Sequence, residues 1–93
     1  MSRTFVRVEL EHATAEPAFC TAMSERGFVR TVKSRATHKQ LRMPPGMFLI
    51  ERTSAREALE LTRDAARNSN TRVRIFCVPV EGKVRFSNLL PAG

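Results

Sequence analysis

The sequence predicts an α+β domain in which strands and helices follow one another in the order βαββαβ, with one more short strand at the end. Two observations carry this prediction. The hydrophobic period switches between two and about 3.6 along the chain, and turn-forming residues mark the switches. The 93 residues suit a single domain spanning 1–93. No run approaches the roughly 18 apolar residues of a membrane span, so we expect a cytoplasmic protein with no membrane partner.

The first half of the chain predicts three strands and one helix. Residues 4–11 alternate apolar and polar side chains, as in a strand with one buried face. Residues 15–26 show helical spacing and end at a glycine. A second strand, rich in β-branched residues, is expected over 28–36. The Met-Pro-Pro-Gly sequence at 43–46 forms a turn, and a short third strand covers 47–52.

The second half predicts one helix and two strands. Ser54 opens the helix with a capping box: its hydroxyl accepts from the backbone N–H of Glu57, whose carboxylate reaches back to the N–H of Ser54. A fourth strand is expected over 72–80. Pro79 removes a ladder donor, so this strand should lie at an edge or carry a bulge. A Glu-Gly turn then leads to a last short strand at 83–86.

This order predicts the split-βαβ, ferredoxin-like arrangement, an antiparallel sheet with both helices on one face. The other face is then open. It suits either stacking of unpaired bases or packing against a second copy of the chain. The glycine and aromatic signature of RNA-recognition modules is missing from the third strand, so we favour a homodimer. We expect its contact face to contain Phe5, Arg7, Phe76 and Val78.

The charge of the chain predicts a phosphate-bearing partner. Sixteen Lys and Arg residues stand against nine Asp and Glu, which gives a net charge of +7. The segment 26–50 contains six of the basic residues and no acidic one. Such a field attracts nucleic acid and speeds its association. We therefore predict RNA binding, with phosphates held by Arg30, Lys33, Arg35, Lys39 and Arg42.

Two residues of this segment are candidates for catalysis. A histidine close to phosphate-binding cations can activate a 2′-hydroxyl or protonate a leaving oxygen in RNA cleavage, which assigns that role to His38. Thr31 is the nearest hydroxyl able to position a proton. The alternative for His38 is a solvent-exposed loop histidine without a catalytic role.

The sequence predicts no cofactor. Cys20 and Cys77 lie far apart, each within an apolar segment, and neither shows the spacing of zinc ligands. Glu9 and Glu11 share one side of the first strand and could hold a divalent ion. A cross-strand ion pair with Arg74 explains Glu9 more economically.

These residues together resemble the small GhoS-type antitoxins. The resemblance rests on Arg7-Val8-Glu9-Leu10, His12, Ala13, Ala22-Met23, Gly27-Phe28, Arg30-Thr31-Val32, Pro45, Gly46 and Phe48. It implies an endoribonuclease with a ferredoxin-like fold, similar to the small CRISPR-associated proteins, that silences a membrane toxin of a type V toxin–antitoxin system by cutting its message. Those CRISPR-associated proteins carry an Asp at the end of the first strand that can hold a metal at the dimer axis. This chain has no Asp there, so the resemblance does not carry a metal site over.

We therefore predict a homodimeric RNA-binding protein that acts as an endoribonuclease antitoxin and takes no small-molecule substrate. The main alternative is a non-catalytic module that binds nucleic acid or an acidic protein, such as a phage-type inhibitor of a nucleic-acid-handling machine. A small-molecule-binding domain is a weaker alternative, because the predicted open face lacks convergent polar groups.

Overall fold

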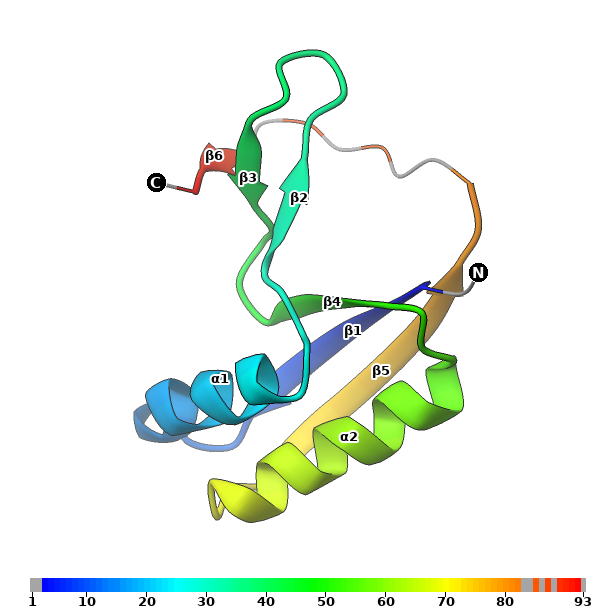
Figure 1. Ribbon diagram of the computed structural model, residues 1–93. Helices are drawn as coiled ribbons and strands as arrows, with labels where there is room; N and C mark the ends of the chain where they lie inside the picture. Colours follow the sequence, from blue (N-terminus) through cyan, green and yellow to red (C-terminus); the bar gives the residue numbers. More distant parts are fainter. Residues whose placement is uncertain (1–2, 83–84, 86, 88, 93) are drawn as a thin grey trace.

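The computed structural model describes residues 3–82, 85, 87 and 89–92 (Figure 1). Its strands form two three-stranded antiparallel sheets, in the orders β4-β1-β5 and β2-β3-β6. The predicted α+β class is confirmed. The elements in chain order are β1 (Arg3–Leu10), a 3-10 turn (Ala13–Ala15), α1 (Glu16–Glu25), β2 (Thr31–Lys33), β3 (Gln40–Arg42), β4 (Met47–Glu51), α2 (Ala55–Asn68), β5 (Val73–Val80) and β6 (Leu90–Pro91).

Both helices lie on one face of the β4-β1-β5 sheet, and the core fills the space between (Figure 1). Alternate residues of the central strand, among them Val6 and Val8, are buried against α1 and α2. The ring of Phe48 from β4 packs edge-to-face against Phe19, at 6.0 Å between centroids, and against Phe28, at 6.3 Å. The predicted one-sided burial of β1 is therefore confirmed, whereas β4 buries the three consecutive residues Phe48, Leu49 and Ile50.

The second helix begins where its capping sequence predicts. The Ser54 hydroxyl accepts from the backbone N–H of Glu57 at 3.2 Å. The other half of the predicted capping box differs, because the Glu57 carboxylate accepts from the Ser54 hydroxyl, also at 3.2 Å. One serine oxygen thus serves both bonds of this helix start.

Strand β5 lies at an edge of its sheet, as its proline predicts. Val8 of β1 donates its N–H to the Gly46 oxygen at 2.7 Å, on the β4 side of the strand. The backbone N–H and C=O groups of the even-numbered β1 residues therefore point towards β4. Thr4 is one of these residues, and it stands opposite Pro79. The backbone nitrogen of Pro79 therefore faces the free edge, where its missing N–H costs no ladder bond.

The predicted second strand at 28–36 is wrong in its extent. Only Val29 pairs with the main sheet: it exchanges two N–H···O bonds of 2.8 Å with Leu49 of β4. The chain then turns away, and β2 pairs with β3 instead. The hairpin closes through bonds from the Ser34 N–H to the Lys39 oxygen, at 2.9 Å, and from the His38 N–H to the Ser34 oxygen, at 2.8 Å.

Strand β3 was not predicted, because Gln40-Leu41-Arg42 has no buried face whose hydrophobic pattern could reveal it. The predicted last strand at 83–86 lies outside the described residues except for Arg85, which belongs to no strand. A different short strand, β6, pairs with β3 through Leu90 and Pro91. In Figure 1 the β2-β3-β6 sheet stands away from the helices, beyond the β4 side of the main sheet.

The connection from β3 to β4 contains Gly46. A residue with a side chain fits at this position only if the neighbouring backbone moves. Gly46 has φ +80°, and a Cβ at this position would stand 2.6 Å from the Val8 oxygen. The Gly46 oxygen also accepts a hydrogen bond from the Val8 N–H. The close approach of the two backbones is what excludes a side chain here.

We predict that Gly46→Ala destabilises the protein more than Gly82→Ala does. Both glycines have a positive φ, which costs an alanine about 1–2 kcal/mol. Gly82 has no neighbouring atom within 4 Å of a new Cβ, so its variant measures the backbone term alone. Urea unfolding followed by circular dichroism gives both free energies of unfolding. Equal losses in the two variants would contradict the contact between Gly46 and β1.

Candidate nucleic-acid interface

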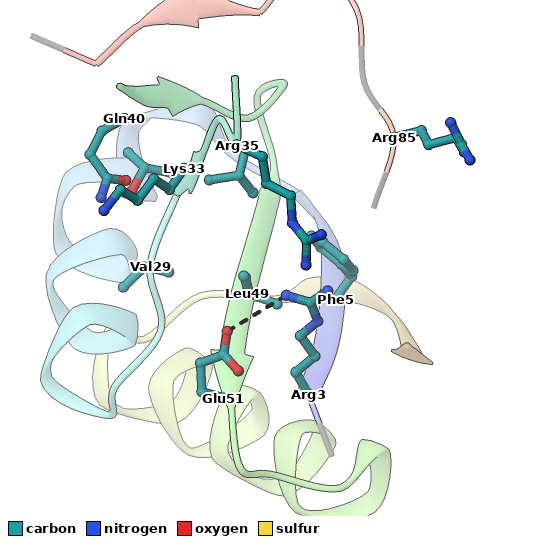
Figure 2. A pocket seen from close by; sticks show the side chains of 11 residues that line it. Arg3, Phe5, Val29, Lys33, Arg35, Gln40, Leu49, Glu51 and Arg85 are labelled. Atoms are coloured by element: carbon teal, nitrogen blue, oxygen red, sulfur yellow. Dashed lines mark ion pairs between the residues drawn. The ribbon is translucent and has the colours of Figure 1, made fainter. Parts of the chain in front are cut away.

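A cleft of about 620 Å³ lies between the β2–β3 hairpin and the β1 and β4 strands of the main sheet. The chain makes one bridge to β4 at Val29 and then continues into the β2–β3 hairpin, which diverges from the main sheet and leaves the cleft between them. Figure 2 shows the side chains that line it. They are Arg3, Phe5, Val29, Thr31, Val32, Lys33, Arg35, Gln40, Leu49, Glu51 and Arg85.

Four of these side chains are cationic and one is acidic. Arg3 lies 4.0 Å from the Glu51 carboxylate, a long and partly exposed ion pair that contributes little to stability. Lys33, Arg35 and Arg85 make no ion pair with any described residue. In Figure 2 the side chains of Arg3 and Arg35 extend towards one another, and Arg85 stands on the opposite side from Lys33. The cleft therefore carries an uncompensated positive charge.

The floor of the cleft is apolar. Phe5 is half-buried, Leu49 is buried, and Val29 is 45% exposed. Phe5 and Leu49 stand opposite one another on β1 and β4. A flat aromatic or aliphatic surface beside cations is the arrangement on which unpaired bases stack while their phosphates are bound.

The five predicted phosphate-binding residues do not share one place. Lys33 and Arg35 line the cleft. Arg30 and Arg42 instead line a second pocket, between α1 and the connection from β3 to β4. Lys39 is exposed near the hairpin turn and lines neither cavity. The basic run of the sequence thus supplies two separate groups of cations and one isolated lysine.

The two candidate catalytic residues also lie apart. Thr31 is half-buried on β2 and lines the cleft. His38 lies beside the hairpin turn with φ +59°, exposed to solvent, and it is not among the residues that line the cleft. The catalytic role of this pair stays a prediction.

The predicted dimer residues share the sheet face opposite the helices. Phe5 stands opposite Val78, and Arg7 stands opposite Phe76, across the β1–β5 ladder. Phe76 is 67% exposed and Val78 is 41% exposed, whereas Phe5 is half-buried in the cleft. The apolar part that stays open to solvent is therefore the β5 side of this face.

The acidic residues and cysteines show no common site in the described part of the chain. The Glu9 carboxylate accepts from Arg74 at 2.6 Å across the ladder, which confirms the economical explanation of Glu9. No group of three His, Cys, Asp or Glu side chains that could hold a metal was found among residues 3–82, 85, 87 and 89–92. Burial raises the pKa of the Cys77 thiol, so this side chain stays protonated and packs as an apolar group.

Sequence reasoning missed Arg3 and Arg85, two of the four cations of the cleft. They lie far from the basic run, and only the fold brings them beside it. For Arg3 the sequence offers one signal, an acidic partner. Arg3 begins β1, and Glu51 ends β4, so antiparallel pairing of the two strands places these residues opposite one another. For Arg85 it offers none, because the alternation of residues 83–86 predicts a strand without indicating what lies beside it.

Comparisons of the chain with models of protein families, with curated proteins and with solved structures found no match. The resemblance to the GhoS-type antitoxins thus rests on the residues quoted above and stays a prediction. Neither α1 nor α2 combines the length and the apolar character that a membrane span requires, and no other helix of that kind occurs in the described residues.

Proposed function

We propose that this protein binds RNA, with the phosphate backbone lying in the cleft between the β2–β3 hairpin and the main sheet. One observation carries the proposal. Cations from three separate segments, the start of β1, the hairpin and the segment after β5, line a single cleft that holds one carboxylate, and the side chains of Arg3 and Arg35 extend towards one another within it. Guanidinium groups bind phosphate with paired hydrogen bonds, and their positive field concentrates the polyanion.

The apolar floor favours a nucleic acid over an acidic protein as the partner. An unpaired strand alternates charged phosphates with flat bases, and the cleft sets Arg3 and Arg35 beside Phe5. A volume of about 620 Å³ matches the roughly 300–1,000 Å³ of pockets that enclose small organic groups, so it accommodates individual nucleotides. A duplex keeps its bases inside and would leave this floor unused.

We further propose a ferredoxin-like fold whose second strand is reduced to one bridge. Taken with Val29, the main sheet runs β5-β1-β4-Val29, and the two helices cover one face. This is the strand order of the split-βαβ arrangement, with the remainder of the second strand diverted into the hairpin.

We also propose that the protein acts as an endoribonuclease antitoxin, with His38 moving the proton. This step rests on the resemblance to the GhoS-type antitoxins, whereas binding rests on the cleft. A non-catalytic RNA-binding module is the second candidate, favoured by one observation: His38 lies by the hairpin turn and not in the cleft.

We also propose that the protein forms a homodimer through the β5 side of the open sheet face. Burial of Phe76 and Val78 against a second copy would remove the exposed apolar side chains of β5 from water. Sedimentation velocity of the purified protein decides the matter, and a single monomeric species at every concentration would exclude the dimer.

We predict that Arg35→Ala and Lys33→Ala each weaken RNA binding and flatten its salt dependence. For a single strand, the slope of log K against log salt falls by about 0.7 for each lost phosphate contact. Arg56→Ala removes the same charge from the exposed face of α2 and serves as the matched control. Filter binding at several salt concentrations measures the slopes. If Arg56→Ala weakens binding as much as Arg35→Ala, the cleft has no special role.

We predict that His38→Ala loses about 10²–10⁴-fold in the rate of RNA cleavage, the usual contribution of a general acid or base, while RNA binding is retained. His12→Ala, the other exposed histidine, is the control and should cleave as the wild type does. Labelled RNA is incubated with each protein, with Mg²⁺ and with chelator. Cleavage that survives in His38→Ala leaves no role for this residue. A wild type that never cleaves identifies the non-catalytic module.

A further inference from the structure

The pocket that contains Arg30 and Arg42 is separate from the cleft and has its own character. It encloses about 470 Å³ between α1 and the β3–β4 connection. Its apolar wall consists of Leu10, Cys20 and Pro45, which lie over the buried core residues Phe19 and Phe48. Both arginines are exposed, so the charged part of the pocket lies at the surface and the apolar part lies beneath it.

The backbone brings the two arginine residues close together, on adjacent positions of paired chain segments. The Met43 N–H donates to the Arg30 oxygen at 2.9 Å, and Arg42 directly precedes Met43. Neither guanidinium pairs with a carboxylate of the described residues. The side-chain contact that Arg30 does make, 3.1 Å from its Nη1 to the Cys20 sulfur, uses a weak acceptor.

Two guanidinium groups that line one pocket and keep unused donors can together bind an oxyanion such as phosphate. Glu16 also lines the pocket, and its carboxylate repels an anion, so the phosphate must lie on the arginine side. A free phosphate ion would make no favourable contact with the apolar wall below. It suits a flat, weakly hydrated group attached to the phosphate, which in RNA is the base.

We propose that this pocket takes one unpaired nucleotide of the bound RNA, with its base against the apolar wall and its phosphate on Arg30 and Arg42. The inference rests on the proposed function and deepens it: the cleft holds the strand by its backbone, and the pocket takes one nucleotide out of the stack. The substrate is then a flexible single strand, since a paired base is not free to turn into a pocket.

Adenosine 5′-monophosphate tests the pocket without RNA, by titration of the ¹⁵N-labelled protein. We expect the amide resonances of pocket residues such as Leu10 and Gly46 to move more than those of the cleft. The nucleotide should bind more tightly than adenosine or inorganic phosphate alone, because each of these fills half of the site. Arg42→Ala should weaken nucleotide binding about tenfold or more, the effect of a lost charge-assisted hydrogen bond. The control Arg56→Ala, which removes an exposed charge of α2 outside both cavities, should leave it unchanged.

A second variant tests the apolar half of the site with both arginines in place. Ala13 is exposed at the pocket rim, so Ala13→Trp should fill the pocket and abolish nucleotide binding. Thr14→Trp, one residue further along and outside the pocket lining, should bind as the wild type does. Undiminished binding by Ala13→Trp overturns the proposal, as does a titration that moves only cleft resonances.

The two proposals fail in different ways. If the protein binds RNA through Lys33 and Arg35 but the nucleotide leaves the pocket resonances unmoved, the pocket is wrong and the cleft stands. If the nucleotide binds in the pocket but the protein retains no RNA, the RNA-binding function is wrong, and the pocket remains a site for a free nucleotide.

Discussion

The two hydrogen bonds between Val29 and Leu49 are the interaction on which the arrangement of this protein depends. They join the chain that leaves α1 to the edge of β4, each at 2.8 Å, and no other residue of that chain segment bridges to the main sheet among the described residues. Beyond this point β2 diverges and pairs with β3. The divergence opens the cleft, since a strand that followed β4 throughout would lie flat in the sheet. At the other end of the hairpin the chain is fixed by the bond from Val8 to Gly46.

This construction explains how a small basic chain can present charge and apolar surface in one place. The helices cover one sheet face and supply the core, which leaves the opposite face and the hairpin available. Arg35 of the hairpin then extends to the side of the cleft where Phe5 lies, and Lys33 lines the other side. On the α1 side of the hairpin, Arg30 and Arg42 stand above a second apolar wall. Both cavities join positive charge to apolar surface, and nucleotides have the complementary chemistry.

The sequence predicted the elements that possess a buried face and missed those that do not. Strands β1 and β5 and helix α1 agree with their predicted ranges to within one residue, and α2 begins where its cap predicts, because a periodic stripe of apolar side chains marks each of them. Strand β3 has no such stripe, so no pattern in its three residues predicts it. Where the second strand leaves the sheet depends on the packing of Leu49 and on the turn at Gly46, and a local pattern does not reveal either.

The site was predicted in its charge and not in its geometry. All five phosphate-binding candidates come from one acid-free run, yet the fold divides them between the cleft, the pocket and the hairpin turn. Arg3 joins Lys33 and Arg35 only through the pairing of β1 with β4. Catalysis is a different matter, because no arrangement of the described residues requires it. The charge and the two cavities argue for binding, and the resemblance alone argues for cutting.

Amide hydrogen exchange at Val29 tests the central claim most directly, since the bridge to Leu49 is what places the hairpin over the sheet. Val29 is 45% exposed, so burial alone does not protect its N–H. The bridge predicts slow exchange at Val29, close to that of the β1 amides, and fast exchange at Ala36 in the hairpin turn. Exchange at Val29 as fast as at Ala36, with β1 still protected, would show that the hairpin is not held to the sheet.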